Sequence, residues 1–168
     1  MTIRRNRTAC VTTVALFCIA SMPAQMQVPY GEPITIDIAK KAAAPARAEA
    51  EKNHLHMAIA IVDPGGELVY FEKMDQTQTA SVQVAIDKAR SAVLYRRPTK
   101  FFEDQLAKGG PGWRFLGLRG AVPVDGGLPL LVNGKIVGAI GLSGGTNTQD
   151  GQCAGAGAAA INGPNWMK

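Results

Sequence analysis

The stretch Gly126–Gly145, with the sequence GGLPLLVNGKIVGAIGLSGG, decides the fold of this chain. It consists of two apolar runs joined by the dipeptide Asn133-Gly134. Asn-Gly suits the two positive-φ positions of a type I′ turn, which is the strongest short-range signal for a β-hairpin. We therefore expect two antiparallel strands connected by a two-residue loop.

The two-residue loop also predicts the register and the faces of this hairpin. The expected pairs are Val132 with Lys135, Leu131 with Ile136, Leu130 with Val137, Pro129 with Gly138 and Leu128 with Ala139. One face would carry Leu131, Ile136, Ile140 and Leu142, and the other Leu128, Leu130, Val132, Val137 and Ala139. Both faces are apolar, which predicts cover on both sides of the sheet. Pro129 cannot donate to a strand ladder, which places its strand at a sheet edge or beside a bulge.

The remaining chain predicts four helices and a second hairpin. A helix should begin at Thr35 and should kink or split near Ala44, because Pro45 follows. Strands over 57–62 and 68–73 should form the second hairpin, and a short edge strand is expected over 121–124. The other helices are expected over 81–96, 99–107 and 148–161. This order of elements predicts an α+β sandwich with an antiparallel sheet covered by helices.

Residues 1–24 have the pattern of a secretory signal peptide. Three arginines precede an apolar run over 9–20, and small residues before Gln25 offer a cleavage site. The apolar run is too short for a comfortable membrane span. We expect residues 25–33 to form an extended leader, residues 34–168 to form one domain, and the mature protein to be periplasmic or secreted.

Composition limits the classes of partner. The 168 residues, 46% of them hydrophobic and 18% charged, suffice for one ordinary globular domain. Cleavage would remove three arginines and no acidic residue, lowering the formal net charge from +5 to +2. The basic balance therefore gives no reason to expect nucleic-acid binding, and no membrane contact is expected after cleavage. Cys10 and Cys18 would also leave, so Cys153 should have no internal disulfide partner.

Two short segments contain candidate ligand-binding residues. His54-Leu55-His56 would place two imidazoles on one side of an extended segment, where they could ligate a metal or haem iron or simply begin a strand. Ser143, Gly144 and the residues up to Thr148 precede a helix, whose first N–H groups can hold a carboxylate or phosphate unless an ordinary cap uses them.

Other candidates are weaker. Asp125, with Asp63 and Asp150, sits beside glycines, where turn formation, capping or a shared pocket would each explain it. Tyr95, with Tyr70 and Cys153, supplies further side chains able to bind iron. Gly141–Gly145 matches G-x-S-x-G, the nucleophile elbow of hydrolases, but the two histidines precede the serine and the strands are antiparallel. We interpret this segment as a glycine-rich strand exit.

Four stretches resemble the GlcG/HbpS family of haem-binding and haem-degrading-type domains, related to the C-terminal domain of PduO. These are AIAIVDPGGELVYFEKMD, KARSAVLYRRPT, GAVPVDGGLPLLVNGKIVGAIGLSGG and the following Gln149-Asp150-Gly151. The resemblance covers about residues 34–161. It implies a profilin-like α+β sandwich around a five-stranded antiparallel sheet and assembly into a homo-oligomer. The shared stretches are mostly turns and strand cores, so the resemblance assigns no haem ligand to this chain.

The resemblance and the candidate residues together predict an exported haem- or tetrapyrrole-binding protein with a role in haem or iron handling or redox sensing. The ligand would lie against an apolar surface, with Lys or Arg meeting its carboxylates. The alternatives are an enzyme that degrades haem or acts on a small carboxylate such as a glycolate-related acid, and a sensory adaptor without a ligand. A binding protein is favoured over a catalyst, because no catalytic residues stand out.

Overall fold

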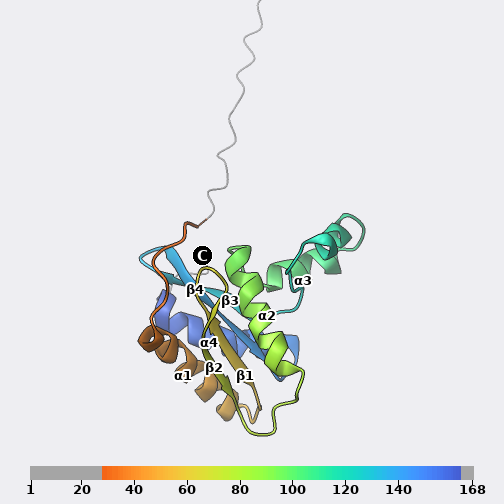
Figure 1. Ribbon diagram of the computed structural model, residues 1–168. Coiled ribbons are helices and arrows are strands. Elements are labelled where there is room, and N and C mark those ends of the chain that lie inside the picture. The colour runs from red at the N-terminus through yellow and green to blue at the C-terminus, as the bar shows by residue number, and fades with distance from the viewer. Residues whose placement is uncertain (1–27, 164–168) are drawn as a thin grey trace, which may run out of the picture.

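The computed structural model describes residues 28–163, and the predicted signal peptide lies outside them (Figure 1). In chain order the elements are α1 (Ile36–Lys52), β1 (Ala58–Val62), β2 (Leu68–Lys73), α2 (Ser81–Leu94), α3 (Lys100–Ala107), the 3₁₀ helix η1 (Gly110–Gly117), β3 (Gly127–Val132), β4 (Lys135–Ser143) and α4 (Asn147–Asn162). Every predicted helix and both hairpins are present. None of the described helices is long and apolar enough to cross a bilayer.

The described strands form one antiparallel sheet with the order β2-β1-β4-β3. The fold class is therefore α+β, as predicted, but the expectation of five strands was wrong. Residues 121–124 form no strand. The Val122 N–H donates to Ser91 Oγ on α2 at 3.0 Å, and Thr99 hydrogen-bonds Gly127 at the start of β3. The segment 121–124 is thus held against α2 rather than beside β3.

The leader before α1 runs along the start of β4. Tyr30 and Ile136 form a single parallel bridge, in which the Gly31 N–H donates to the Ile136 carbonyl at 2.8 Å. The Ile136 N–H in turn donates to the Pro29 carbonyl at 2.9 Å. Because β1 pairs with β4 only over Ala139–Ser143, the leader satisfies the backbone groups that β1 leaves free.

The register of the β3–β4 hairpin is confirmed beside the turn and wrong beyond it. Val132 pairs with Lys135 and Leu131 with Ile136, but a register shift between Leu130 and Leu131 then pairs Leu130 with Gly138 and Pro129 with Ala139. Pro129 therefore lies both on an edge strand and next to a bulge, as its missing N–H predicted. The bulge moves Ile140 and Leu142 to the same side as Leu128 and Leu130.

Helices cover both faces of the sheet, as the apolar hairpin predicted (Figure 1). α1 and α4 pack on the face that carries Ile59, Ile61 and Ile140, and α2 packs on the opposite face. The α2 interface consists largely of alanines, which lets the helix approach closely. An added Cβ on Gly141 would lie 2.2 Å from the Ala85 carbonyl oxygen. The small helix faces are thus used inside the protomer.

α1 begins where predicted, with Thr35 as the N-cap accepting from the Ile38 N–H. Pro45 does not split it, because α1 continues to Lys52 as one helix. Five alanines of α1 are buried, and α1 packs against α4. This tertiary packing offsets the cost of about 3 kcal/mol that a proline imposes on a helix interior.

Candidate functional site

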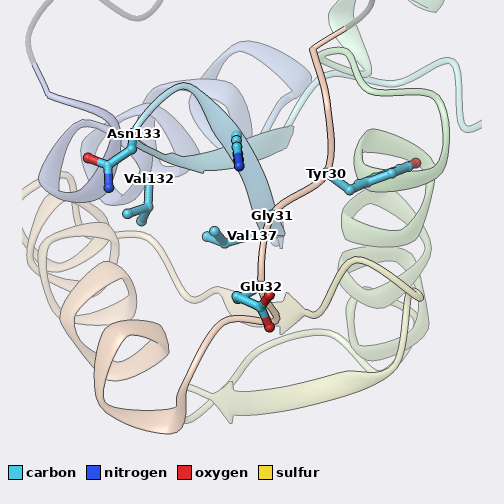
Figure 2. Close-up of a pocket in the computed structure, with 7 residues that line it drawn as sticks. Tyr30, Gly31, Glu32, Val132, Asn133 and Val137 are labelled. Carbon is cyan, nitrogen blue, oxygen red and sulfur yellow. The ribbon is translucent and has the colours of Figure 1, made fainter.

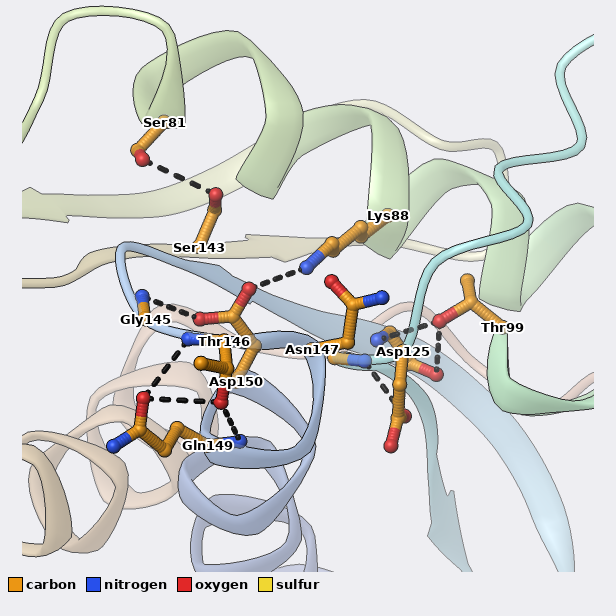
Figure 3. A network of polar contacts seen from close by, with 12 residues as sticks. Ser81, Lys88, Thr99, Asp125, Ser143, Gly145, Thr146, Asn147, Gln149 and Asp150 are labelled. Atoms are coloured by element: carbon orange, nitrogen blue, oxygen red, sulfur yellow. Dashed lines mark hydrogen bonds and ion pairs between the residues drawn. The ribbon is translucent and has the colours of Figure 1, made fainter. Parts of the chain in front are cut away.

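A polar cluster lies where β4 ends and α4 begins (Figure 3). Its centre is an ion pair between Lys88 of α2 and Asp150 of α4, with Nζ 2.6 Å from Oδ2. The two side chains are only 1% and 4% exposed. The second carboxylate oxygen of Asp150 accepts from the Gly145 N–H at 2.9 Å. One buried pair therefore joins α2, the exit of β4 and the first turn of α4.

Two glycines make room for this pair. A Cβ on Gly126 would lie 2.8 Å from Asp150 Cβ and 3.0 Å from Lys88 Nζ, and a Cβ on Gly127 would lie 2.4 Å from the Lys88 carbonyl oxygen. Gly126 also has φ +118, which a residue with a side chain rarely adopts. The GG pair at the start of the hairpin sequence is therefore required by packing against Lys88.

The Lys88–Asp150 ion pair holds α2 and α4 together and has a structural role. Burial raises the pKa of the Asp150 carboxyl, and the hydrogen bond from Lys88 opposes that rise. Among the described residues, no buried side-chain nitrogen or oxygen lacks a hydrogen-bond partner. Lys88 donates to Asp150 and is closed to solvent, so it is not positioned as a nucleophile.

Sequence reasoning missed Lys88, although a signal was present. Lys88 lies three residues after Ala85 and four before Ala92, and both alanines are on the buried face of α2. A lysine at that spacing must either pair or displace the helix, because an isolated charge is costly to bury. The acidic partner, 62 residues away, could not be identified from the spacing.

Three of the predicted binding residues lie at this cluster. Ser143 donates to Ser81 Oγ at 3.2 Å and is buried, while Gly144 follows it with φ +155. The main chain of His56 passes beside Gly144, since a Cβ there would lie 2.2 Å from the His56 carbonyl oxygen. Asp125 lies across the cluster, because a Cβ on Gly151 would lie 2.3 Å from its carboxylate.

The expected anion site at the start of α4 is already hydrogen-bonded by the protein. Thr146 and Gln149 form a capping box, in which each side chain accepts from the backbone N–H of the other. Asp150 accepts from Gly145. The N–H groups of Gly145, Thr146 and Gln149 are therefore not free to bind a carboxylate.

The solvent-facing rim of the cluster is acidic. Glu103 Oε2 accepts from the Asp125 N–H at 2.9 Å and from Asn147 Nδ2 at 3.2 Å. Burial raises the pKa of the Asp125 carboxyl, and the nearby charge of Glu103 adds to that effect. This rim can accept hydrogen bonds or hold a proton, and Lys100 Nζ, 3.4 Å from Glu103 Oε1, offsets part of its negative charge.

The two histidines are exposed at the turn after α1. His54 has φ +55, so the premise that both imidazoles lie along one extended segment was wrong. The described residues contain no group of three His, Cys, Asp or Glu side chains placed to hold a metal ion. His54 and His56 are therefore accessible side chains rather than part of a preformed metal centre.

Tyr95 lies away from the cluster, at the C-terminal end of α2. Its hydroxyl donates to the Arg119 carbonyl at 2.7 Å, and its ring meets Phe102 edge-on with centroids 5.2 Å apart. Tyr95 thus attaches the segment around η1 to the body of the protein.

A hollow of about 400 Å³ lies between the leader and the β3–β4 turn (Figure 2). It is lined by Tyr30, Gly31, Glu32, Val132, Asn133, Lys135 and Val137. Figure 2 shows Tyr30 directed towards α2, where its hydroxyl donates to the Val93 carbonyl at 2.9 Å. The hollow combines one acidic and one basic side chain with an amide.

Comparison with known proteins identifies relatives. The chain is 36% identical to Protein GlcG of Escherichia coli K12 over 95 residues, which cover 56% of this chain and 69% of that protein. A crystal structure of a Streptomyces reticuli HbpS double mutant matches with a TM-score of 0.68 and 29% identity, over 90% of this chain and 97% of that one.

A crystal structure of a PduOC:heme complex matches with a TM-score of 0.70 and 26% identity, covering 77% of this chain and 96% of that one. The family described as "Haem degrading protein HbpS-like" matches residues 34–159. This range contains both hairpins and nearly all of the polar cluster. The chain therefore belongs to the HbpS-like family.

Proposed function

We propose that this protein is exported and then binds haem or a closely related tetrapyrrole, with a role in haem or iron handling or redox sensing. The observation that carries the proposal is the match to a relative solved as a haem complex, over 96% of that relative's chain. Accessible imidazoles and basic side chains on the surface supply the groups that an iron porphyrin with two carboxylates requires.

Export rests on residues 1–24, which lie outside the described residues. Their basic, apolar and small-residue segments follow the order of a cleaved signal. Mass spectrometry of protein recovered from outside the cytoplasm should give an N-terminus close to Gln25. An intact N-terminus in the membrane fraction would contradict cleavage.

Haem binding is tested by titration of the mature protein. Addition of haem should produce a Soret band that saturates at a fixed number of haem molecules per protomer. Incubation of the complex with a reductant and oxygen then distinguishes binder from enzyme. A stable spectrum supports a binding protein, and progressive loss of the Soret band supports haem degradation.

The histidines are the first iron ligands to test. Because His54 and His56 are both exposed, replacing both with Ala should leave the protein folded, with a small loss of stability because His54 has φ +55, which alanine adopts less readily. If an imidazole ligates the iron, the double variant should bind haem more weakly and its Soret maximum should move. Equal titrations at pH 7 would remove histidine from the site and leave Tyr70 and Tyr95 for testing, because Cys153 is only 1% exposed.

We also propose that the protein forms a homo-oligomer. The family resemblance implies assembly, and exposed apolar side chains on the protomer surface support it. Leu68 on the edge strand β2 and Ile36 at the start of α1 are each 44% exposed. Light scattering across micromolar concentrations should give more than one protomer mass, and a monomer throughout would refute the proposal.

A further inference from the structure

Residues 100–119, which we call the arm, comprise α3, the link Lys108-Gly109, η1 and the two residues that follow. Figure 1 shows the arm extending away from the sheet beyond the end of α2. It packs chiefly on itself, through edge-to-face contacts among Phe101, Phe102 and Phe115. Gly112 makes the turn possible, because a Cβ there would lie 1.9 Å from the Gln105 carbonyl oxygen.

The arm exposes large apolar side chains. Trp113 is 65% exposed, Leu116 66% and Leu118 37%. In a 3₁₀ helix, side chains three residues apart are eclipsed, so Trp113 and Leu116 form one ridge of η1. The adjacent ridge carries Pro111 and Arg114, while Phe115 packs towards α3. An apolar ridge therefore lies directly beside a basic one.

A hollow of about 190 Å³ lies on the basic side of the arm. Its lining includes Lys108, Arg114, Gln105 and the Phe115 ring, and contains no acidic side chain. Within residues 28–163, no ion pair neutralises Lys108 or Arg114, because the acidic residues of α3 pair with Lys100. The hollow thus combines two cations without an ion-pair partner among the described residues, an amide and the Phe115 ring, over which Arg114 lies at 5.5 Å, in a volume suited to a carboxylate group.

We propose that the arm is the tetrapyrrole-binding surface of this protein. One propionate of the ligand enters the hollow between Lys108 and Arg114, and the macrocycle lies over Trp113 and Leu116. Charge-assisted hydrogen bonds hold the carboxylate, and burial of the indole and leucine against the flat ring supplies the apolar contribution. This inference rests on the proposed function and names where that ligand binds.

The other surfaces fit such a ligand less well. The rim of the polar cluster presents Glu103 and Asp125, and the nearby Lys100 is already shared between Glu103 and Asp104, so among the described residues this rim offers no free cation to a propionate. The hollow beside the leader sets Glu32 against Lys135 and leaves little net positive charge. Residues 100–119 contain no histidine, so the carboxylate and ring contacts of the arm do not depend on iron. The arm should therefore accept protoporphyrin IX, which contains no metal, as well as haem.

The test compares two charge reversals of equal size in the mature protein. The arm variant carries two substitutions in the hollow, Lys108→Glu and Arg114→Glu. The control variant changes the net charge by the same amount on an exposed stretch of α1, through Lys40→Glu and Lys41→Glu. Haem and protoporphyrin IX are titrated against both variants and the wild type. The arm variant should lose at least about tenfold in affinity for both porphyrins, and the α1 variant should match the wild type.

A second variant, Leu116→Ser, keeps the charges and removes part of the apolar ridge. It should also lower the affinity for both porphyrins. Circular dichroism with thermal melting verifies that each variant is folded. If the reversal in the arm prevents folding, Lys108→Ala alone carries the electrostatic test.

Each contrary outcome has a distinct meaning. If the wild type binds and both arm variants bind equally well, the arm inference is overturned while the proposed function stands. If the wild type binds neither porphyrin, both are overturned. If Leu116→Ser changes the mass in light scattering but not the porphyrin affinity, the arm is a subunit interface, and the inference is again overturned.

Discussion

Breaking the Lys88–Asp150 pair should cost more stability than any single surface change. Lys88→Met keeps the length and most of the volume of the side chain but removes its charge. Asp150, in the first turn of α4, would then be a carboxylate only 4% exposed that still accepts from the Gly145 N–H but has lost its cation. Removing one partner of a buried pair typically costs about 3–5 kcal/mol, because the other charge remains buried and uncompensated.

The assay is denaturant unfolding at pH 7, read by far-ultraviolet circular dichroism. We expect the free energy of unfolding to fall by about 3–5 kcal/mol and the melting temperature to fall by roughly 10 °C. Adding Asp150→Asn to Lys88→Met should recover part of the loss, because the asparagine is neutral and can still accept from Gly145. The matched control is Lys100→Met, which removes an exposed lysine paired with Asp104 and should leave unfolding nearly unchanged.

Two results would refute this reasoning. One is a Lys88→Met variant that unfolds like the Lys100→Met control, which would mean that the pair is solvated rather than buried. The other is a double variant whose loss equals the sum of the two single losses, which would mean that the two charges are not coupled.

Two further predictions concern the central turn and the single described cysteine. Gly134→Val should destabilise the protein by about 1–2 kcal/mol through backbone strain alone, because Gly134 has φ +73 and no atom lies within 4 Å of an added Cβ. The control Gly134→Asn should cost less, because asparagine adopts positive φ more readily. Equal melting temperatures for the valine variant and the wild type would contradict the turn geometry. Cys153 is 1% exposed and burial raises its thiol pKa to about 11, so native protein beginning at Gln25 should react with a disulfide reagent at pH 8 far more slowly than unfolded protein. Rapid labelling of the native form would show that α4 opens readily.

Local chemistry explains why much of the fold was predictable. Asn133 and Gly134 have φ of 51° and 73°, as a type I′ turn requires, and this turn fixes the pairing of the nearest residues. Thr35 begins α1 because its hydroxyl accepts an N–H three residues away. Helices and hairpins are specified by residues close in sequence, so their positions follow from the sequence without a structure.

The candidate site was less predictable because its parts come from distant segments. Ser143, Gly144 and Asp125 were identified through their positions at strand and helix ends, and they do lie together. The histidines were identified by spacing alone, and the left-handed conformation of His54 removes the extended geometry that this spacing assumed. The exposure of Trp113 and Leu116 had no signal in the sequence, since their periodicity also suits a buried face.

The sequence by itself determined the α+β class, the two hairpins, the helices and the family. Only the tertiary structure decided the number of strands, the bulge beside Leu131 and the pairing of Lys88 with Asp150. Each of these depends on which elements become neighbours. Residues 121–124 form no strand because α2 offers Ser91 as a partner, and Lys88 can be buried because α4 brings a carboxylate to within 2.6 Å of its Nζ.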